Sequence, residues 1–142
     1  MTAYWLIKSE PDEYSWQQLK TDRSTIWSGV RNYEARNNLR AMQAGDLALF
    51  YHSNKNPAIV GIAKVVQEHF QDPTADAATW SAVSFAPLMD LATPVTLQTL
   101  KQLPDFADMD LVRRGRLSVG KVSAGEFAKI CSMGGIKPPA DR

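Results

Sequence analysis

The sequence predicts an α+β domain in which a barrel-like sheet is flanked by short helices. Residues 47–51 and 59–66 are both nearly continuous apolar runs, and a short polar turn containing Pro57 separates them. Strands without polarity on either face are buried on both faces, so we expect these two runs to pair as a hairpin beneath covering helices. Apolar residues at helical spacing before and after this hairpin predict those helices.

The composition fits one globular domain. The 142 residues are 44% hydrophobic and 22% charged, with a formal net charge of +1. A charge this small argues against a protein that grips long stretches of phosphate backbone. We expect a single domain over 1–135 and a mobile tail over 136–142. No apolar run approaches a membrane span, no signal peptide is evident, and the single Cys131 cannot form an internal disulfide, so we expect a cytoplasmic protein.

The other elements follow from alternation and from capping residues. Alternation over 4–9 predicts a strand with Trp5, Ile7 and Ser9 on its core side. Residues 80–89 predict a strand that Pro87 confines to an edge or a bend. We expect a further short strand at 116–119 and short helices after the capping residues Ser15, Thr96 and Ser123.

The richest stretch runs from Trp27 to Met42. Trp27 precedes Ser28 and Gly29, and Asn32 then caps a helix with an apolar stripe and a polar line formed by Asn32, Arg36 and Arg40. An aromatic face, free backbone N–H groups and guanidinium donors together suit a planar polar ligand such as a nucleobase with its phosphate. An ordinary amphipathic helix after a core tryptophan fits this window equally well.

The chain shows little that points to catalysis. Cys131 lies on the apolar stripe of the last helix, His69 lies in a polar stretch, and only His52, at the end of a buried strand, is placed to line a pocket. We therefore expect no metal site, no cofactor and no enzyme activity. Glu10, next to the inward-facing Ser9, is the one carboxylate that could serve as an acid or base.

Several separated segments resemble the EVE domain family, whose relatives are the PUA and YTH domains. They are Tyr-Trp-Leu-Ile-Lys-Ser-Glu-Pro at 4–11, the whole stretch 27–42, Phe-Tyr-His-Ser-Asn at 50–54, Val-Gly-Ile-Ala at 60–63 and Arg-Leu-Ser-Val at 116–119. The resemblance spans residues 3–133. It implies a PUA-like mixed β pseudobarrel and a non-catalytic domain that binds DNA or RNA carrying a modified base, such as 5-methylcytosine, in an aromatic-walled pocket.

The resemblance also implies the site residues. The base pocket would be lined by Lys8, Ser9, Glu10, Trp27, Asn32, Tyr51, His52, Ser53 and Ser118. Apart from the resemblance, such a pocket needs cationic groups at its mouth for phosphate, and we expect Arg31, Arg36 and Arg116 to supply them. This chain has Ser28 where the family usually has Asp, which removes a charged acceptor from the pocket loop.

Two other functions remain open from the residues alone. One is an enzyme that acts on a flipped base, such as a glycosidase using Glu10 or His52. The other is a sensor whose pocket holds a free nucleotide or metabolite. We expect a monomer, and the sequence favours neither DNA nor RNA.

Overall fold

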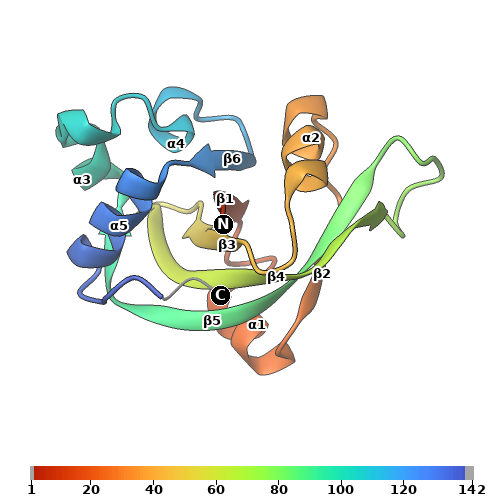
Figure 1. Ribbon diagram of the computed structural model, residues 1–142, viewed down its shortest axis with the longest axis horizontal. Coiled ribbons are helices and arrows are strands. Elements are labelled where there is room, and N and C mark those ends of the chain that lie inside the picture. Colours follow the sequence, from red (N-terminus) through yellow and green to blue (C-terminus); the bar gives the residue numbers. More distant parts are fainter. Residues whose placement is uncertain (1, 140–142) are drawn as a thin grey trace.

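The computed structural model describes residues 2–139 and contains one mixed sheet with the strand order β2-β5-β4-β3-β1-β6 (Figure 1). The strands are β1 Tyr4–Ser9, β2 Thr25–Trp27, β3 Leu47–His52, β4 Ala58–Gln71, β5 Ser81–Thr96 and β6 Val119–Val122. β1 and β3 are parallel, whereas the other neighbouring strands are antiparallel. The helices are α1 Trp16–Asp22, α2 Tyr33–Ala41, α3 Leu97–Gln102, the 3₁₀ turn η1 Pro104–Phe106, α4 Asp110–Arg113 and α5 Ala124–Met133.

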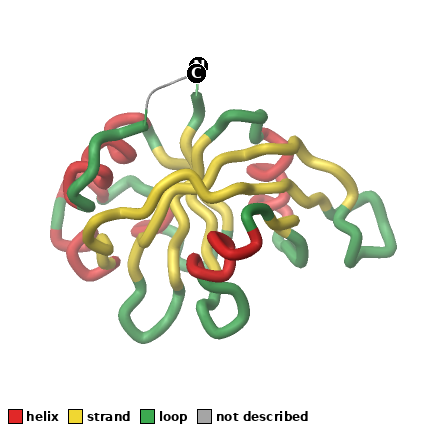
Figure 2. Tube along the Cα trace, turned by 90° about the horizontal axis from the view of Figure 1, so that it is seen from below, coloured by secondary structure: helices red, strands yellow, loops and turns green. Residues whose placement is uncertain are grey.

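The sheet is strongly curved because its two longest strands are irregular (Figure 2). The register between β4 and β5 shifts at four places, and Pro87 lies at one of them, opposite Ala63. Such bulges bend a strand and increase its twist. β2 and β6 form the two edges of the sheet, and α2 contacts both β5, next to the first edge, and β6 at the second. The predicted α+β class and barrel-like sheet with flanking helices are therefore confirmed.

Both faces of the central strands are buried, as the apolar runs predicted. Trp5 and Ile7 point into a core shared with α1 and α2, while Leu6 points into a second core formed with α3, α4 and α5. β3 alternates in the same way, with Phe50 in the first core and Leu49 in the second. The sheet is thus a wall between two apolar layers, which holds the ends of β1 and β3 in place.

The predicted capping residues begin the helices. Ser15, Asn32, Thr96 and Ser123 each accept a backbone N–H at the start of α1, α2, α3 and α5, and Ser123 forms a full capping box with Glu126. These short-range signals were readable because a cap depends on a side chain and a backbone only two or three residues apart.

Some predicted boundaries were wrong. The strand expected at 116–119 begins only at Val119, because Leu117 N–H donates to Arg114 O and closes a turn before the chain reaches the sheet. β4 extends beyond 59–66 into a two-stranded arm, residues 66–82 with their connecting loop, and its residues there are mostly exposed and form no apolar run. β5 extends beyond 80–89 at its other end, where residues 90–96 pair with the start of β4. In the tail expected over 136–142, Ile136 packs on the second core, and residues 140–142 lie outside the described part of the chain.

Gly61 in β4 is required by close packing. A Cβ at this position would lie 2.3 Å from ring atoms of Trp16, which is buried against the first core. We expect Gly61→Ala to displace the ring and to lower the free energy of unfolding by about 1–3 kcal/mol, as overpacking of a core does. Urea unfolding followed by tryptophan fluorescence would measure this, and an unchanged midpoint would contradict the packing.

Candidate base-binding site

A cavity of about 580 Å³ opens where the two edges of the curved sheet approach each other. Its wall comes from three separate segments: the end of β1 with the turn that follows it, β2 with the loop leading into α2, and Ser118 just before β6. Since β2 and β6 are the edge strands, the cavity occupies the gap that the sheet does not close. Its volume lies within the range of small-ligand sites, roughly 300–1,000 Å³.

Trp27 forms the aromatic part of this wall. The side chain is partly exposed, and its ring packs edge-on against Phe50 at 5.6 Å, Phe85 at 5.8 Å and Tyr14 at 6.2 Å between centroids. Edge-to-face contacts of this kind fix the plane of a ring. Trp27 therefore presents a surface to the cavity in one orientation, held by the first core.

The end of β1 supplies Lys8, Ser9 and Glu10 to the cavity. Lys8 Nζ donates to Gly115 O at 2.8 Å, and burial lowers the pKa of this lysine. The Ser9 hydroxyl donates to the carbonyl oxygen of Tyr14, so Ser9 holds the turn that brings Tyr14 to the wall. Glu10 accepts two backbone N–H groups of the same turn with its carbonyl oxygen, and its carboxylate oxygen Oε1 accepts Asp12 N–H at 3.5 Å; Glu10 and Glu13 both line the cavity.

Asn32 and Ser118 complete the predicted residues that the structure brings to the cavity. Asn32 Oδ1 accepts Ala35 N–H at 2.9 Å to cap α2, which leaves its NH₂ group as the available donor. Ser118 O accepts Lys8 N–H at 3.0 Å, so this residue is attached to β1 although it precedes β6.

The structure places Tyr51, His52 and Ser53 elsewhere. The Tyr51 ring is buried in the second core. Nε2 of His52 accepts Trp16 N–H at 3.0 Å, and burial lowers the pKa of this imidazole. Ser53 donates both its N–H and its hydroxyl to Ser9 O. None of the three lines the cavity, because the segment between β1 and α1 bonds to the end of β3 and the Tyr51 ring is buried in the second core.

Asp72, which is not among the predicted site residues, positions the cavity loop. Its buried carboxylate accepts Gly29 N–H at 2.7 Å, Arg31 Nη1 at 3.0 Å, and both the N–H and the hydroxyl of Thr74 at 2.7 and 2.6 Å. Burial alone would raise the pKa of Asp72, but the hydrogen bonds from Thr74, Gly29 and Arg31 outweigh it and lower the pKa to about 2. The Asp-Pro-Thr sequence at 72–74 does signal an Asx turn, but nothing local reveals its partner 43 residues away.

The three predicted phosphate-binding arginines lie in different surroundings. Arg31 lines the cavity, with its guanidinium held by Asp72. Arg116 is exposed in a neighbouring hollow of about 340 Å³, which it lines with Asn32, Arg113 and Arg114. Arg36 lies outside both and donates to Thr79 O at the tip of the arm. The two hollows meet at Asn32, so cationic groups flank one side of the cavity.

Little in the described residues resembles a metal or nucleophile site. Residues 2–139 contain no group of three or more His, Cys, Asp and Glu side chains that could hold a metal ion. Burial raises the pKa of Cys131 to about 11, which keeps the thiol protonated and unreactive. Among the same residues, no helix is both long and apolar enough to cross a membrane.

Solved structures resemble this fold over nearly the whole chain. The protein Atu2648 from Agrobacterium tumefaciens is 41% identical, with a TM-score of 0.95 and coverage of 99% of each chain. The human THYN1 protein in complex with 5-methylcytosine-containing DNA is 33% identical, with a TM-score of 0.85 and coverage of 96% of this chain and all of that one. A YTH domain of Zygosaccharomyces rouxii MRB1 protein, 17% identical with a TM-score of 0.59 over 99% of this chain and 90% of that one, shares the fold and supports its PUA-like character.

The sequence pattern of the EVE domain matches residues 3–133, which is the span that the motif resemblance indicated. It includes β1 through α5 and therefore every segment that lines the cavity. The chain belongs to the EVE domain family.

Proposed function

We propose that this protein is a non-catalytic reader of a modified nucleobase, which enters the cavity as a single unstacked nucleotide. The observation that carries this proposal is the position of Trp27, a fixed aromatic wall in a cavity that Arg31 flanks. The human THYN1 protein, whose fold this chain shares at 33% sequence identity, has been solved in complex with DNA containing 5-methylcytosine. Modified cytosine, 5-methylcytosine above all, is therefore the first ligand to test.

The cavity has the groups that a base requires. A flat apolar wall stacks on the ring, and the Asn32 amide can donate to acceptors on the base edge. The carboxylates of Glu10 and Glu13 can accept from an exocyclic amino group such as N4 of cytosine. These two carboxylates repel phosphate. We therefore expect the nucleic acid backbone to follow the side of the cavity that carries Arg31 and the neighbouring hollow lined by Arg116.

Burial of the surface area of one methyl group is not enough for strong selectivity towards a methylated base. Burying one methyl contributes about 0.8 kcal/mol, roughly a fourfold change in affinity. Stronger discrimination arises when a rigid site leaves a void or an unpaired polar group without the methyl. The core contacts of Trp27 and the hydrogen bonds of Asp72 to the loop that follows it supply such rigidity along this wall of the cavity.

A binding screen tests the proposal. Fluorescence anisotropy would compare cytosine, 5-methylcytosine, 5-hydroxymethylcytosine and N6-methyladenine, each in single and double strands of DNA and RNA. We expect one modified base to bind at least about tenfold more tightly than its plain counterpart. Equal binding of all of them, or binding that follows charge alone, would reject the reader.

A base-releasing enzyme is the alternative that Glu10 keeps open, since its carboxylate lies at the cavity. We expect the purified protein to release no base and to cleave no strand from any of these oligonucleotides, and Glu10→Gln to differ only in affinity. Chromatography of the products would decide this. Base release that Glu10→Gln abolishes would establish the enzyme.

Arg116→Ala should weaken binding of all sequences alike. If only three or four phosphates are contacted, the slope of log K against log salt should be about −2 to −4, and this variant should reduce its size by about 0.7–0.9. Lys101→Ala, which removes an equal charge on α3, is the matched control and should leave the slope unchanged. A slope near −10 would indicate a duplex-coating protein instead.

A further inference from the structure

Two aromatic rings lie just outside the cavity. Tyr33, the first residue of α2, is 63% exposed, and its ring centroid lies 5.1 Å from that of Trp80 at an interplanar angle of 32°. Two guanidinium groups accompany them: Arg36 Cζ is 4.9 Å from the Tyr33 ring centroid, and Arg31 Cζ is 5.6 Å from that of Trp80. We call these four residues the outer shelf.

The outer shelf is continuous with the cavity. Arg31 belongs to both, since it lines the cavity and also lies over the Trp80 ring. Asn32, which lines the cavity, is followed directly by Tyr33. A nucleic acid strand whose base occupies the cavity would therefore reach the outer shelf with its adjacent nucleotide.

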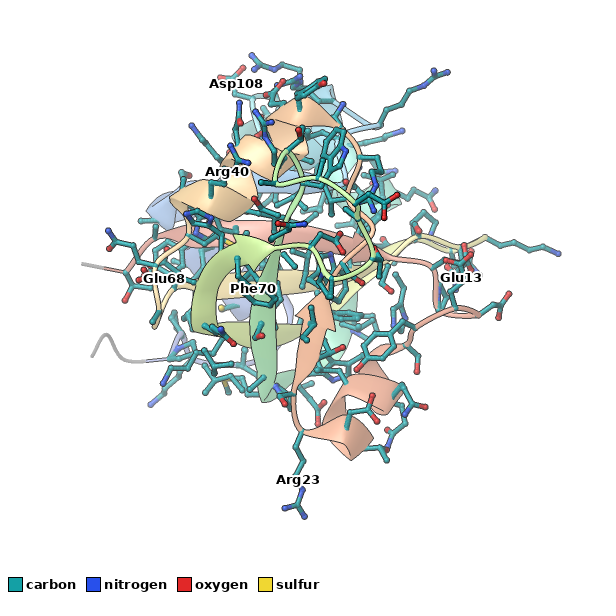
Figure 3. The ribbon with its side chains drawn as sticks, turned by 90° about the vertical axis from the view of Figure 1, so that its right-hand side faces the viewer. Glu13, Arg23, Arg40, Glu68, Phe70 and Asp108 are labelled. Carbon is teal, nitrogen blue, oxygen red and sulfur yellow. The ribbon has the colours of Figure 1, made fainter. Side chains whose placement is uncertain are left out.

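The rings are not needed to hold the arm against α2. Arg40 donates to Ser81 Oγ at 2.9 Å and to the carbonyl oxygens of Ala78 and Thr79 at 3.0 Å, and Arg36 also donates to Thr79 O. Figure 3 shows α2, with Arg40, beside the arm that carries Phe70. These bonds fix the tip of the arm, and the Tyr33 ring stays 63% exposed beside Trp80 and Arg36, so a ligand can reach its open part.

The chemistry of the outer shelf suits a neighbouring nucleotide. Aromatic faces stack on any base and so add affinity without sequence preference. Guanidinium groups beside the rings can contact the phosphate that joins this nucleotide to the one in the cavity. On the acidic side of the cavity, the lining residues between Lys8 and Tyr14 include no guanidinium group.

We propose that the outer shelf is a second nucleotide subsite, which stacks the base directly adjacent to the modified one. It rests on the proposed function, because it needs the modified base in the cavity. It makes the protein a reader of an oligonucleotide rather than of a free nucleoside. The stacking chemistry is common to DNA and RNA, so both must be tested.

The experiment uses pentanucleotides with 5-methylcytosine at the centre, as DNA and as RNA. In matched oligonucleotides the 5′ or the 3′ neighbour is abasic, which removes the base but keeps the phosphate. We expect the wild-type protein to bind at least about fivefold more weakly when the neighbour on one side is abasic. Tyr33→Ala should abolish this difference, whereas Tyr33→Phe, which keeps the ring, should preserve it.

The outcomes separate the two proposals. If the protein selects 5-methylcytosine but tolerates an abasic neighbour on either side, the outer shelf is refuted and the reader stands. If Tyr33→Phe loses as much as Tyr33→Ala, stacking is refuted. Failure to select any modified base in the screen described above would overturn the reader, and the subsite with it. A preference seen only with RNA or only with DNA supports the subsite and identifies the natural strand.

Discussion

Trp27→Ala is expected to abolish selective binding and, at the same time, to destabilise the protein. Losing a base–aromatic stack costs about 1–3 kcal/mol, or ~5- to 150-fold in affinity. Removing a buried tryptophan costs about 3–5 kcal/mol of stability. Trp27 should lie near the lower end of this range, because its ring packs on Phe50 and Phe85 but its side chain is partly exposed. Anisotropy titrations and urea unfolding of the same sample measure the two effects.

Two variants separate these effects. Trp27→Phe should retain part of the packing but present a smaller face to the base. We therefore expect this variant to lose more free energy of binding than free energy of unfolding. Gly61→Ala should lose stability but retain selectivity, because Gly61 packs on Trp16 and does not line the cavity. Undiminished selectivity in folded Trp27→Ala would show that Trp27 serves the core alone.

Asp72→Ala should loosen the cavity loop although Asp72 does not itself line the cavity. The variant removes the acceptor of Gly29 N–H and of Arg31 Nη1, so the loop that leads from Trp27 into α2 loses its attachment to the arm. We expect stability to fall by about 2 kcal/mol and affinity for the modified oligonucleotide to fall at least about tenfold through lost preorganisation. Hydrogen exchange at residues 28–32 would report the loosening directly.

The pH dependence of stability provides a second measure of Asp72. Its folded pKa, about 2, lies below the ordinary value of 3.8, so its contribution is fully present above about pH 4 and is lost as pH falls toward 2. Asp72→Asn keeps the shape but cannot titrate, and its unfolding free energy should fall less steeply than that of the wild type over this range. Parallel profiles for the two proteins would contradict the assigned hydrogen bonds.

Much of the fold could be predicted because its determinants are local. Apolar runs marked β3 and the buried half of β4, and single side chains marked the starts of four helices. The second half of β4 and the start of β6 could not be predicted in this way, because an exposed strand segment and a turn at Arg114 leave no apolar pattern.

The candidate site depended on a different kind of information. Lys8, Ser9 and Glu10 follow each other at the end of one strand, and Trp27, Arg31 and Asn32 belong to one short segment, so the resemblance could name them as sets. The structure brings both sets to one cavity but leaves out Tyr51, His52 and Ser53, which belong to a neighbouring strand end. The ends of β1 and β3 do lie side by side. The sequence did not reveal, however, in which direction each side chain at these ends points.

The sequence by itself determined the class of fold, the burial of β3 and of the first half of β4 on both faces, and the aromatic and cationic character of residues 27–40. Only the tertiary structure decided where the cavity opens, that Asp72 fixes its loop, and that Trp80 pairs with Tyr33 beside it. The physical reason is that strand burial and helix capping depend on residues close in the chain, whereas the cavity depends on how far the sheet curves. That curvature arises from register shifts between β4 and β5, and it brings together groups more than 40 residues apart.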